Sequence, residues 1–206
     1  MDKDLSDLLR LYEARSQSEL ALMATLSPAE FQQRVDEFLL YVGPGTGQFL
    51  NTLARDSGAR RILELGTSYG YSTLWLADAA RATGGKVTSL ELHPGKRKFA
   101  LEQLAKVRLD AVVDIKLGDA TQIIPTLDGA IDFVLVDLWK ELYVRCFDLF
   151  LPKLARGAFV IADNMLQPEA ARPQTGAYRR HLLATGRFDT VQLPIGSGIE
   201  VSRLVR

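Results

Sequence analysis

Carboxylate and amide side chains follow two apolar segments in the second half of the sequence. Asp137 follows one of them, and Asp163 and Asn164 follow the other. If these segments are neighbouring parallel strands, the three side chains meet at one edge of a sheet, where the strands end. Two carboxylates and an amide oxygen form the hard oxygen set that Mg²⁺ prefers. The alternative is that each aspartate serves only as the N-cap of the following helix.

A glycine-rich turn follows an earlier apolar segment, residues 62–65. Gly66 and Gly70 let the backbone bend tightly and approach a ligand that a side chain would hold away. The spacing is not the G-x-G-x-x-G of dinucleotide binders, which disfavours NAD-dependent reduction. Glu64, inside the segment, would repel a phosphate but suits a ligand that carries an amino group.

Two more acids stand where later apolar segments end. Glu91 follows residues 87–90 and can accept hydrogen bonds from both hydroxyls of a ribose. Asp119 follows residues 112–117 and can accept one from an adenine amino group. Ordinary turns also place acids near helix N-termini, where the helix dipole favours them. The glycine turn with Glu64, together with Glu91 and Asp119, would lie at successive strand ends along one sheet edge. We therefore expect these three positions to contact one ligand.

The elements that must position these residues alternate along the chain from residue 61. Short apolar segments are typical of buried parallel strands, and the stretches between them have helical spacing. Successive strand–helix units predict an α/β fold with a doubly wound, Rossmann-like sheet and right-handed crossovers. Strands are expected at 62–65, 87–90, 112–117, 131–136 and 158–162, and helices at 72–83, 94–107, 121–127, 142–154 and 174–184.

Both ends of the chain depart from this alternation. Segments 189–193 and 199–205 are joined by so short a link that they must form an antiparallel hairpin. The hairpin completes a seven-stranded, mostly parallel sheet. We expect a single domain over residues 1–206, with an N-terminal helical cap at 1–55 and an α/β core at 56–206.

The N-terminal cap is expected to consist of helices because its apolar residues recur at helical spacing. The sequence Ser27-Pro28-Ala29-Glu30 combines an N-cap, a proline at the first helical position and the acid of a capping box. It predicts a helix that runs to about Tyr41. Glycines and a proline then break the helix, and a further short helix is expected at 48–55.

Composition and charge exclude several classes of function. The 25 Lys and Arg residues balance 25 Asp and Glu residues, so the chain has no net charge to attract nucleic acid or an anionic membrane. Its longest uncharged stretch, residues 38–54, is broken by glycine and proline and cannot span a bilayer. One cysteine, Cys146, excludes an internal disulfide and fits the reducing cytoplasm. The acidic residues 1–40 and the basic residues 172–206 suit either contact within a homodimer or a solvated surface.

The motifs together resemble the S-adenosylmethionine site of class I methyltransferases, whose sheet also ends in an antiparallel hairpin. More narrowly, the G-Q-F-L sequence at 47–50 and the G-Y-S sequence at 70–72 resemble the cation-dependent O-methyltransferases of the catechol and caffeoyl-CoA type. The D-x-W-K sequence at Asp137 and the A-D-N sequence at Asp163 match the metal-ligand motifs of that family. The resemblance covers residues 41–164 and is looser beyond them.

The resemblance implies an enzyme that transfers a methyl group from S-adenosylmethionine to a hydroxyl of a small catechol-like acceptor, a vicinal diol. Asp137, Asp163 and Asn164 would bind Mg²⁺ or another divalent cation, which lowers the pKa of a chelated hydroxyl. Lys140 would be the general base, with Asp137 as the second catalytic residue; otherwise Lys140 is a solvated lysine at a helix start. The implied cofactor-binding residues are Val42, Glu64, Gly66, Thr67, Ser72, Glu91, Asp119, Ala120, Asp137 and Trp139.

Other assignments stay open at this level. A metal-independent methyltransferase would keep the cofactor and methylate a phenol, amine or carboxylate directly, and a binding module would hold the cofactor without turnover. His93 either flanks the adenine or forms the turn before a helix. Beyond Asn164 the resemblance weakens, and we expect the N-terminal helices and residues 165–175 to cover the acceptor pocket. Arg172 is expected at the surface, and Glu200 is not expected to bind substrate.

Overall fold

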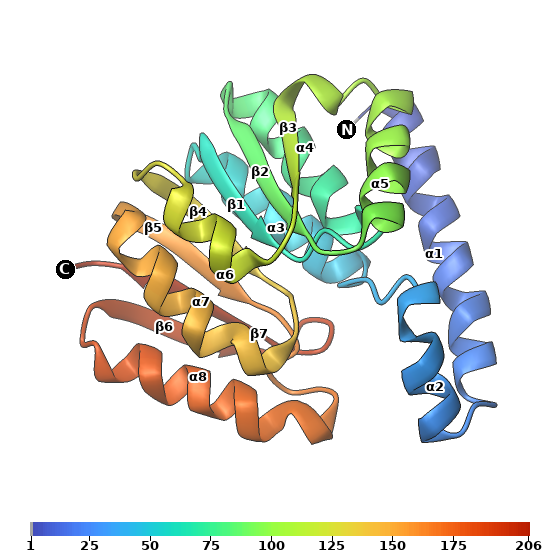
Figure 1. Cartoon of the computed structure of the whole chain (residues 1–206). Helices are drawn as coiled ribbons and strands as arrows, with labels where there is room; N and C mark the ends of the chain where they lie inside the picture. The colour runs from blue at the N-terminus through green and yellow to red at the C-terminus, as the bar shows by residue number, and fades with distance from the viewer. Residues whose placement is uncertain (1) are drawn as a thin grey trace.

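A seven-stranded sheet runs through the middle of the computed structural model, which describes residues 2–206 (Figure 1). The strands are β1 Arg61–Leu65, β2 Lys86–Glu91, β3 Val113–Leu117, β4 Ile131–Val136, β5 Leu154–Ala162, β6 Phe188–Leu193 and β7 Ile199–Leu204. Their order is β3-β2-β1-β4-β5-β7-β6; the first five are parallel, and β7 is antiparallel to both of its neighbours. This confirms the predicted doubly wound sheet with its C-terminal antiparallel hairpin.

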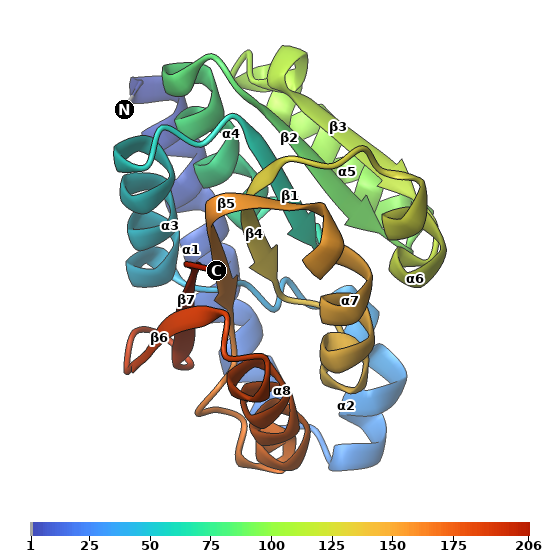
Figure 2. The same ribbon diagram turned by 90° about the vertical axis from the view of Figure 1, so that its left-hand side faces the viewer.

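Helices cover both faces of the sheet (Figures 1 and 2). They are α1 Lys3–Met23, α2 Pro28–Arg34, α3 Pro44–Asp56, α4 Tyr71–Thr83, α5 Pro94–Lys106, α6 Ala120–Ile123, α7 Tyr143–Phe150 and α8 Arg172–Ala184. Because right-handed crossovers run in opposite directions from β1, α4 and α5 pack on one face and α6 and α7 on the other. Within residues 2–206, every helix is too short or too polar to cross a bilayer.

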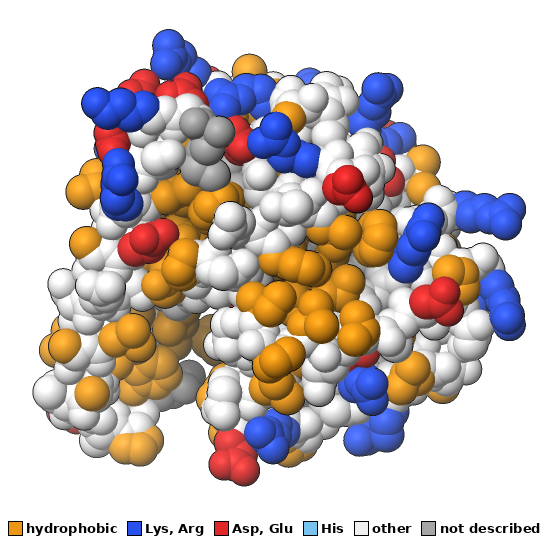
Figure 3. All heavy atoms as spheres, turned by 180° about the vertical axis from the view of Figure 1, so that it is seen from behind, with side chains coloured by type: hydrophobic (Ala, Val, Ile, Leu, Met, Phe, Trp, Pro, Cys, Tyr) orange, Lys and Arg blue, Asp and Glu red, His pale blue; other side chains and the backbone are white. Residues whose placement is uncertain are grey.

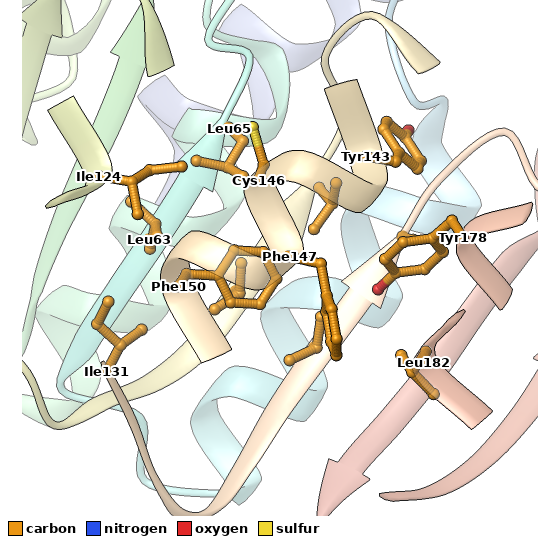
Figure 4. Close-up of a cluster of buried hydrophobic side chains, with 14 of the residues drawn as sticks. Leu63, Leu65, Ile124, Ile131, Tyr143, Cys146, Phe147, Phe150, Tyr178 and Leu182 are labelled. Carbon is orange, nitrogen blue, oxygen red and sulfur yellow. The ribbon is translucent and has the colours of Figure 1, made fainter. Parts of the chain in front are cut away.

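Aromatic side chains fill the core on the face that α7 and α8 cover. Tyr143, Phe147 and Phe150 of α7 and Tyr178 of α8 are fully buried there (Figure 4). The three α7 residues lie at spacings of four and three, which places them on one side of the helix, toward the sheet. This packing fixes α7 against β4 and β5, and so fixes the strand ends that carry the predicted site residues.

The helix that begins after Ser27 is shorter than predicted. Its capping box is present, with Glu30 bonding back to the backbone of Ser27. However, α2 ends at Arg34, a 3₁₀ turn follows, and the expected continuation to Tyr41 is wrong. The helix ends early because Phe38 is packed into the core, which makes the chain extended at that residue. Tertiary packing therefore overrides the local preference for helix.

Prolines explain the other differences in helix boundaries. The helix expected at 142–154 ends at Phe150, because Pro152 has no N–H to continue it, and the strand β5 then begins at Leu154. The helix expected at 48–55 begins earlier, at Pro44, where proline suits the first helical position.

The N-terminal helices form an arm that reaches past the carboxyl ends of the strands (Figures 1 and 2). The first half of α1 is anchored by buried apolar residues that include Leu5, Leu9 and Tyr12. Toward its other end, Leu20 and Leu22 are exposed. Seen from behind, a hollow separates this arm from the rest of the molecule (Figure 3). The arm therefore stands beside the sheet edge where the predicted site residues gather.

Candidate active site

The carboxyl ends of β1 and β4 are joined at the centre of the sheet. The backbone N–H of Asp137 donates to the carbonyl oxygen of Leu65 at 2.9 Å. The next residue of the first segment, Gly66, has a φ of 100°, and a Cβ there would overlap the carbonyl oxygen of Asp137. Only glycine fits this position without displacing its neighbour. The structure thus brings the predicted glycine turn against the first predicted metal motif.

Glu64 lies fully buried near the end of β1. Its carboxylate accepts hydrogen bonds from the hydroxyls of Ser72 at 2.6 Å, Thr73 at 2.6 Å and Ser89 at 2.5 Å. Burial raises the pKa of this carboxyl group to about 7, although the three hydroxyls act in the opposite direction. The hydroxyl of Thr67 in turn pairs with that of Ser89. One side of the site therefore contains an acid whose charge changes near neutral pH.

Glu91 ends β2 and orders the loops on either side of it. One carboxylate oxygen accepts from the backbone N–H of Ser68 at 2.6 Å and the other from that of His93 at 2.8 Å. His93 is the N-cap of α5, where its Nδ1 accepts from the N–H of Gly95. The structure therefore shows His93 in the turn before the helix, one of its two predicted places. Each oxygen of Glu91 keeps a further lone pair for a ligand hydroxyl.

The predicted adenine side lies at the start of α6. Asp119 is the N-cap of this helix, and its Oδ1 accepts from both the N–H and the hydroxyl of Thr121, at 2.7 and 2.8 Å. These hydrogen bonds hold the pKa of Asp119 below its usual value. Ala120 is the first residue of α6. Trp139 stands apart, 49% exposed, at the start of the 3₁₀ turn Lys140–Leu142.

A small cavity lies between the segment before α3 and the turn after β1. Five of the predicted cofactor residues line it: Val42, Gly66, Thr67, Ser72 and Asp137. The other five, Glu64, Glu91, Asp119, Ala120 and Trp139, lie outside this wall. The prediction missed the aromatic part of the wall, which consists of Tyr41, Tyr69 and Tyr71. The position of the last two beside Gly70 is the signal that could have indicated them.

Asp137 and Lys140 form an ion pair at the end of β4. Lys140 Nζ donates to Asp137 Oδ1 at 3.1 Å and to the carbonyl oxygen of Leu138 at 3.0 Å. Both side chains are largely shielded from solvent, with 19% of the lysine and 14% of the aspartate exposed. Burial raises the pKa of Asp137, and the positive charge of Lys140 opposes that change. The pair places an amine and a carboxylate side by side.

Asp163 follows β5 and is almost completely buried. Among the residues that the structure describes, its Oδ1 has no hydrogen-bond partner. Burial and the negative charge of Asp137 raise the pKa of Asp163. The next residue, Asn164, has a φ of 58°, a left-handed conformation that asparagine tolerates.

These features fit a divalent cation. A buried carboxylate oxygen without a partner is costly, and a positive charge would relieve Asp163, whose pKa is raised by burial and by the charge of Asp137. No group of three or more His, Cys, Asp or Glu side chains that could hold a metal is present in residues 2–206. A cation bound here would therefore need the predicted set, two carboxylates and the amide of Asn164, whose oxygens are of the kind that Mg²⁺ prefers.

Comparisons with known proteins identify relatives over most of the chain. The profile of a family described as O-methyltransferase matches residues 13–205. A catechol O-methyltransferase from Niastella koreensis is 34% identical over 171 residues, which cover 81% of this chain and 73% of that protein. An O-methyltransferase from Bacillus cereus, solved in complex with SAH, has a TM-score of 0.76 and 25% identity over 99% of this chain and 91% of its own. One from Streptomyces achromogenes, solved with SAM, has a TM-score of 0.74 and 25% identity over the full length of both chains.

Proposed function

This chain belongs to the O-methyltransferase family, and we propose that it transfers a methyl group from S-adenosylmethionine to one hydroxyl of a small vicinal diol. It is an S-adenosylmethionine-dependent O-methyltransferase of the catechol and caffeoyl-CoA type. The observation that supports a diol acceptor is the buried Oδ1 of Asp163, for which the described part of the chain offers no hydrogen-bond partner. A cation held at this oxygen would favour an acceptor with two adjacent oxygens to chelate it.

In this proposal, Asp137, Asp163 and Asn164 hold Mg²⁺ or another divalent cation. Their oxygens are the hard ligands that such cations prefer, and the two carboxylates supply the negative charge. A bound cation supplies a Lewis acid, which lowers the pKa of a chelated hydroxyl. The protein contributes the rigid strand ends of β4 and β5 that keep the ligand side chains in place.

Lys140 is the proposed general base. Its Nζ is held by the carboxylate of Asp137 and the carbonyl of Leu138, which keeps it beside the proposed cation site, where the acceptor hydroxyl would lie. In its neutral form, Nζ can take the proton that this hydroxyl loses. Most of the rate enhancement would then come from holding the acceptor oxygen in line with the methyl group.

The cofactor is proposed to lie along the sheet edge from the cavity to α6. The backbone of Val42 and the hydroxyl of Ser72 would serve its methionine end, and Glu91 the ribose. Asp119, the amide of Ala120 and Trp139 would surround the adenine. The acceptor would approach from the side of the N-terminal arm, helices α1 and α2, where Figure 3 shows a hollow beside the core.

The protein is expected to methylate a catechol in the presence of Mg²⁺ and S-adenosylmethionine, and to lose this activity when EDTA is added. The physical reason is that the diol must be chelated to lose its proton near neutral pH. Mass spectrometry of the products from a panel of catechols measures this, with matched monophenols, which cannot chelate, as the control. Activity that is insensitive to EDTA would favour a metal-independent methyltransferase. Cofactor binding without methylation of any acceptor would favour a binding module.

The affinity for S-adenosylhomocysteine is expected to rise about tenfold between pH 6 and pH 8. The pKa of Glu64 is about 7 in the free protein, so its carboxyl group is mostly neutral at pH 6 and mostly ionised at pH 8. The ionised form attracts the ammonium group of the cofactor. By the same shift, the free protein loses stability as the pH rises from the ordinary value of 4.5 through about 7. Titration calorimetry across this range gives the dissociation constants.

Two variants separate Glu64 from the other acids. Glu64→Gln removes the titrating carboxyl group, so its dissociation constant for S-adenosylhomocysteine should be nearly independent of pH. Glu102→Gln, at an exposed position of α5, should keep the wild-type profile. If Glu64→Gln keeps the wild-type slope, Glu64 is not the group that the cofactor senses.

A further inference from the structure

One buried side chain, Tyr143, connects the two halves of the proposed site. It is the first residue of α7 and is fully buried. Its hydroxyl donates to the main-chain carbonyl oxygen of Asp163 at 3.0 Å. Its ring lies beside Lys140, with Nζ 5.0 Å from the ring centroid. A single side chain thus contacts the β4 motif through the proposed base and the β5 motif through the backbone of a proposed ligand.

The carbonyl that Tyr143 binds belongs to the peptide unit between Asp163 and Asn164. The chain is anchored on both sides of this unit, because the N–H of Asp163 donates to β4 and the N–H of Met165 donates to the loop before β7. Rotation of the peptide unit would change ψ of Asp163 and φ of Asn164 together. The φ of Asn164 is in the left-handed region, so the conformation of this peptide unit sets the backbone from which both side chains project. The hydrogen bond from Tyr143 fixes the orientation between the two anchors.

We propose that Tyr143 is a positioning residue, which aims Asp163 and Asn164 at the same cation while its ring keeps Lys140 beside them. The proposal rests on the proposed function, because it takes these two residues as cation ligands. Tyr143 does not contribute to the described wall of the cavity. Its effect should therefore fall on cation binding and turnover and leave cofactor binding unchanged.

Tyr178 of α8 provides a matched control for Tyr143. The two rings pack edge to face with their centroids 5.5 Å apart, and Tyr178 is also fully buried. In the described part of the chain, the Tyr178 hydroxyl has no hydrogen-bond partner. The two phenol oxygens point in different directions (Figure 4). Tyr143→Phe and Tyr178→Phe each remove one oxygen from the same cluster, but only the first removes a bond to the ligand-bearing peptide.

Titration calorimetry with Mg²⁺ alone and with S-adenosylhomocysteine alone tests the proposal in both variants. Tyr143→Phe is expected to weaken Mg²⁺ binding about tenfold, as loss of a group that orients metal ligands does. It should also lower kcat for a catechol at saturating Mg²⁺, with the S-adenosylhomocysteine dissociation constant unchanged. Hydrogen exchange of residues 163–167 should become faster. Tyr178→Phe should match the wild type in all four measurements.

Each other outcome overturns the proposal in a distinguishable way. If the wild type binds Mg²⁺ and Tyr143→Phe binds it equally well with wild-type kcat, the positioning role is wrong and the proposed function stands. If Tyr143→Phe and Tyr178→Phe lose Mg²⁺ affinity equally, the effect belongs to packing of the aromatic cluster, and the positioning role is also wrong. If the wild type binds no Mg²⁺, the proposed cation site fails and this inference fails with it.

Discussion

We expect Asp163→Asn to lower kcat/KM for a catechol by at least about a thousandfold while the fold stays intact. The substitution keeps the shape of the side chain but removes half of the carboxylate charge proposed to hold the cation. In the metal-free protein, burial and the charge of Asp137 raise the pKa of Asp163, so the carboxyl group is itself a burden on stability. The Tm without metal should therefore not fall. Steady-state kinetics and thermal unfolding measure the two effects separately.

Asp148→Asn is the control for this substitution. Asp148 lies exposed on α7 and pairs with His181 at 2.6 Å, away from the strand ends. The Asp148→Asn variant should keep wild-type kinetics, because exposed ion pairs of this kind contribute little to the stability of the fold. If Asp163→Asn kept both its activity and its dependence on Mg²⁺, Asp163 would be excluded as a ligand.

Gly66→Ala is expected to destabilise the protein by about 3 kcal/mol or more and to abolish detectable binding of S-adenosylhomocysteine. The φ of 100° at this position is strained for any residue with a side chain, and the new methyl group would overlap the main chain of Asp137. Backbone at a strand end cannot move aside as a flexible side chain can. The turn after β1 would have to shift, and it forms part of the cavity wall. Urea denaturation and titration calorimetry give the two values.

Gly129→Ala tests whether the effect is specific to the turn. A Cβ at Gly129 would meet nothing closer than the carbonyl oxygen of Lys153 at 3.9 Å, and its φ is not in the positive range. Its stability should stay within about 0.5 kcal/mol of the wild type. Equal destabilisation by the two substitutions would show that the contact with Asp137 has no special role.

The sheet could be predicted because its inner strands are buried on both faces and therefore form short apolar runs. The expected segment 131–136 coincides with β4. The start of β5 could not be found in this way, because residues 154–157 are partly exposed and include Arg156, so the apolar run begins only at Ala158. Helix ends depended on tertiary burial, as at Phe38, which local spacing does not reveal.

The candidate site could be predicted as a set of strand ends but not as a network of contacts. Parallel topology alone indicates that acids after successive strands, such as Asp137 and Asp163, share one edge. Some of the contacts at these strand ends come from distant parts of the chain. Ser68 supplies an N–H to Glu91, and Tyr143 bonds the backbone of Asp163. Such pairs depend on side-chain rotamers and loop geometry, which a single sequence does not specify.

The contact between Gly66 and the main chain of Asp137 gives the proposed cofactor and cation sites a common boundary. A displacement of the β4 end would reach both ligands at once, because its backbone borders one and its side chain faces the other. We therefore expect the binding free energies at the two proposed sites to be thermodynamically linked. Whatever factor the cation adds to the affinity for the cofactor, the cofactor adds equally to the affinity for the cation. If that factor is greater than one, enzyme that has bound the cofactor binds the cation more tightly, and enzyme that has bound the cation binds the cofactor more tightly.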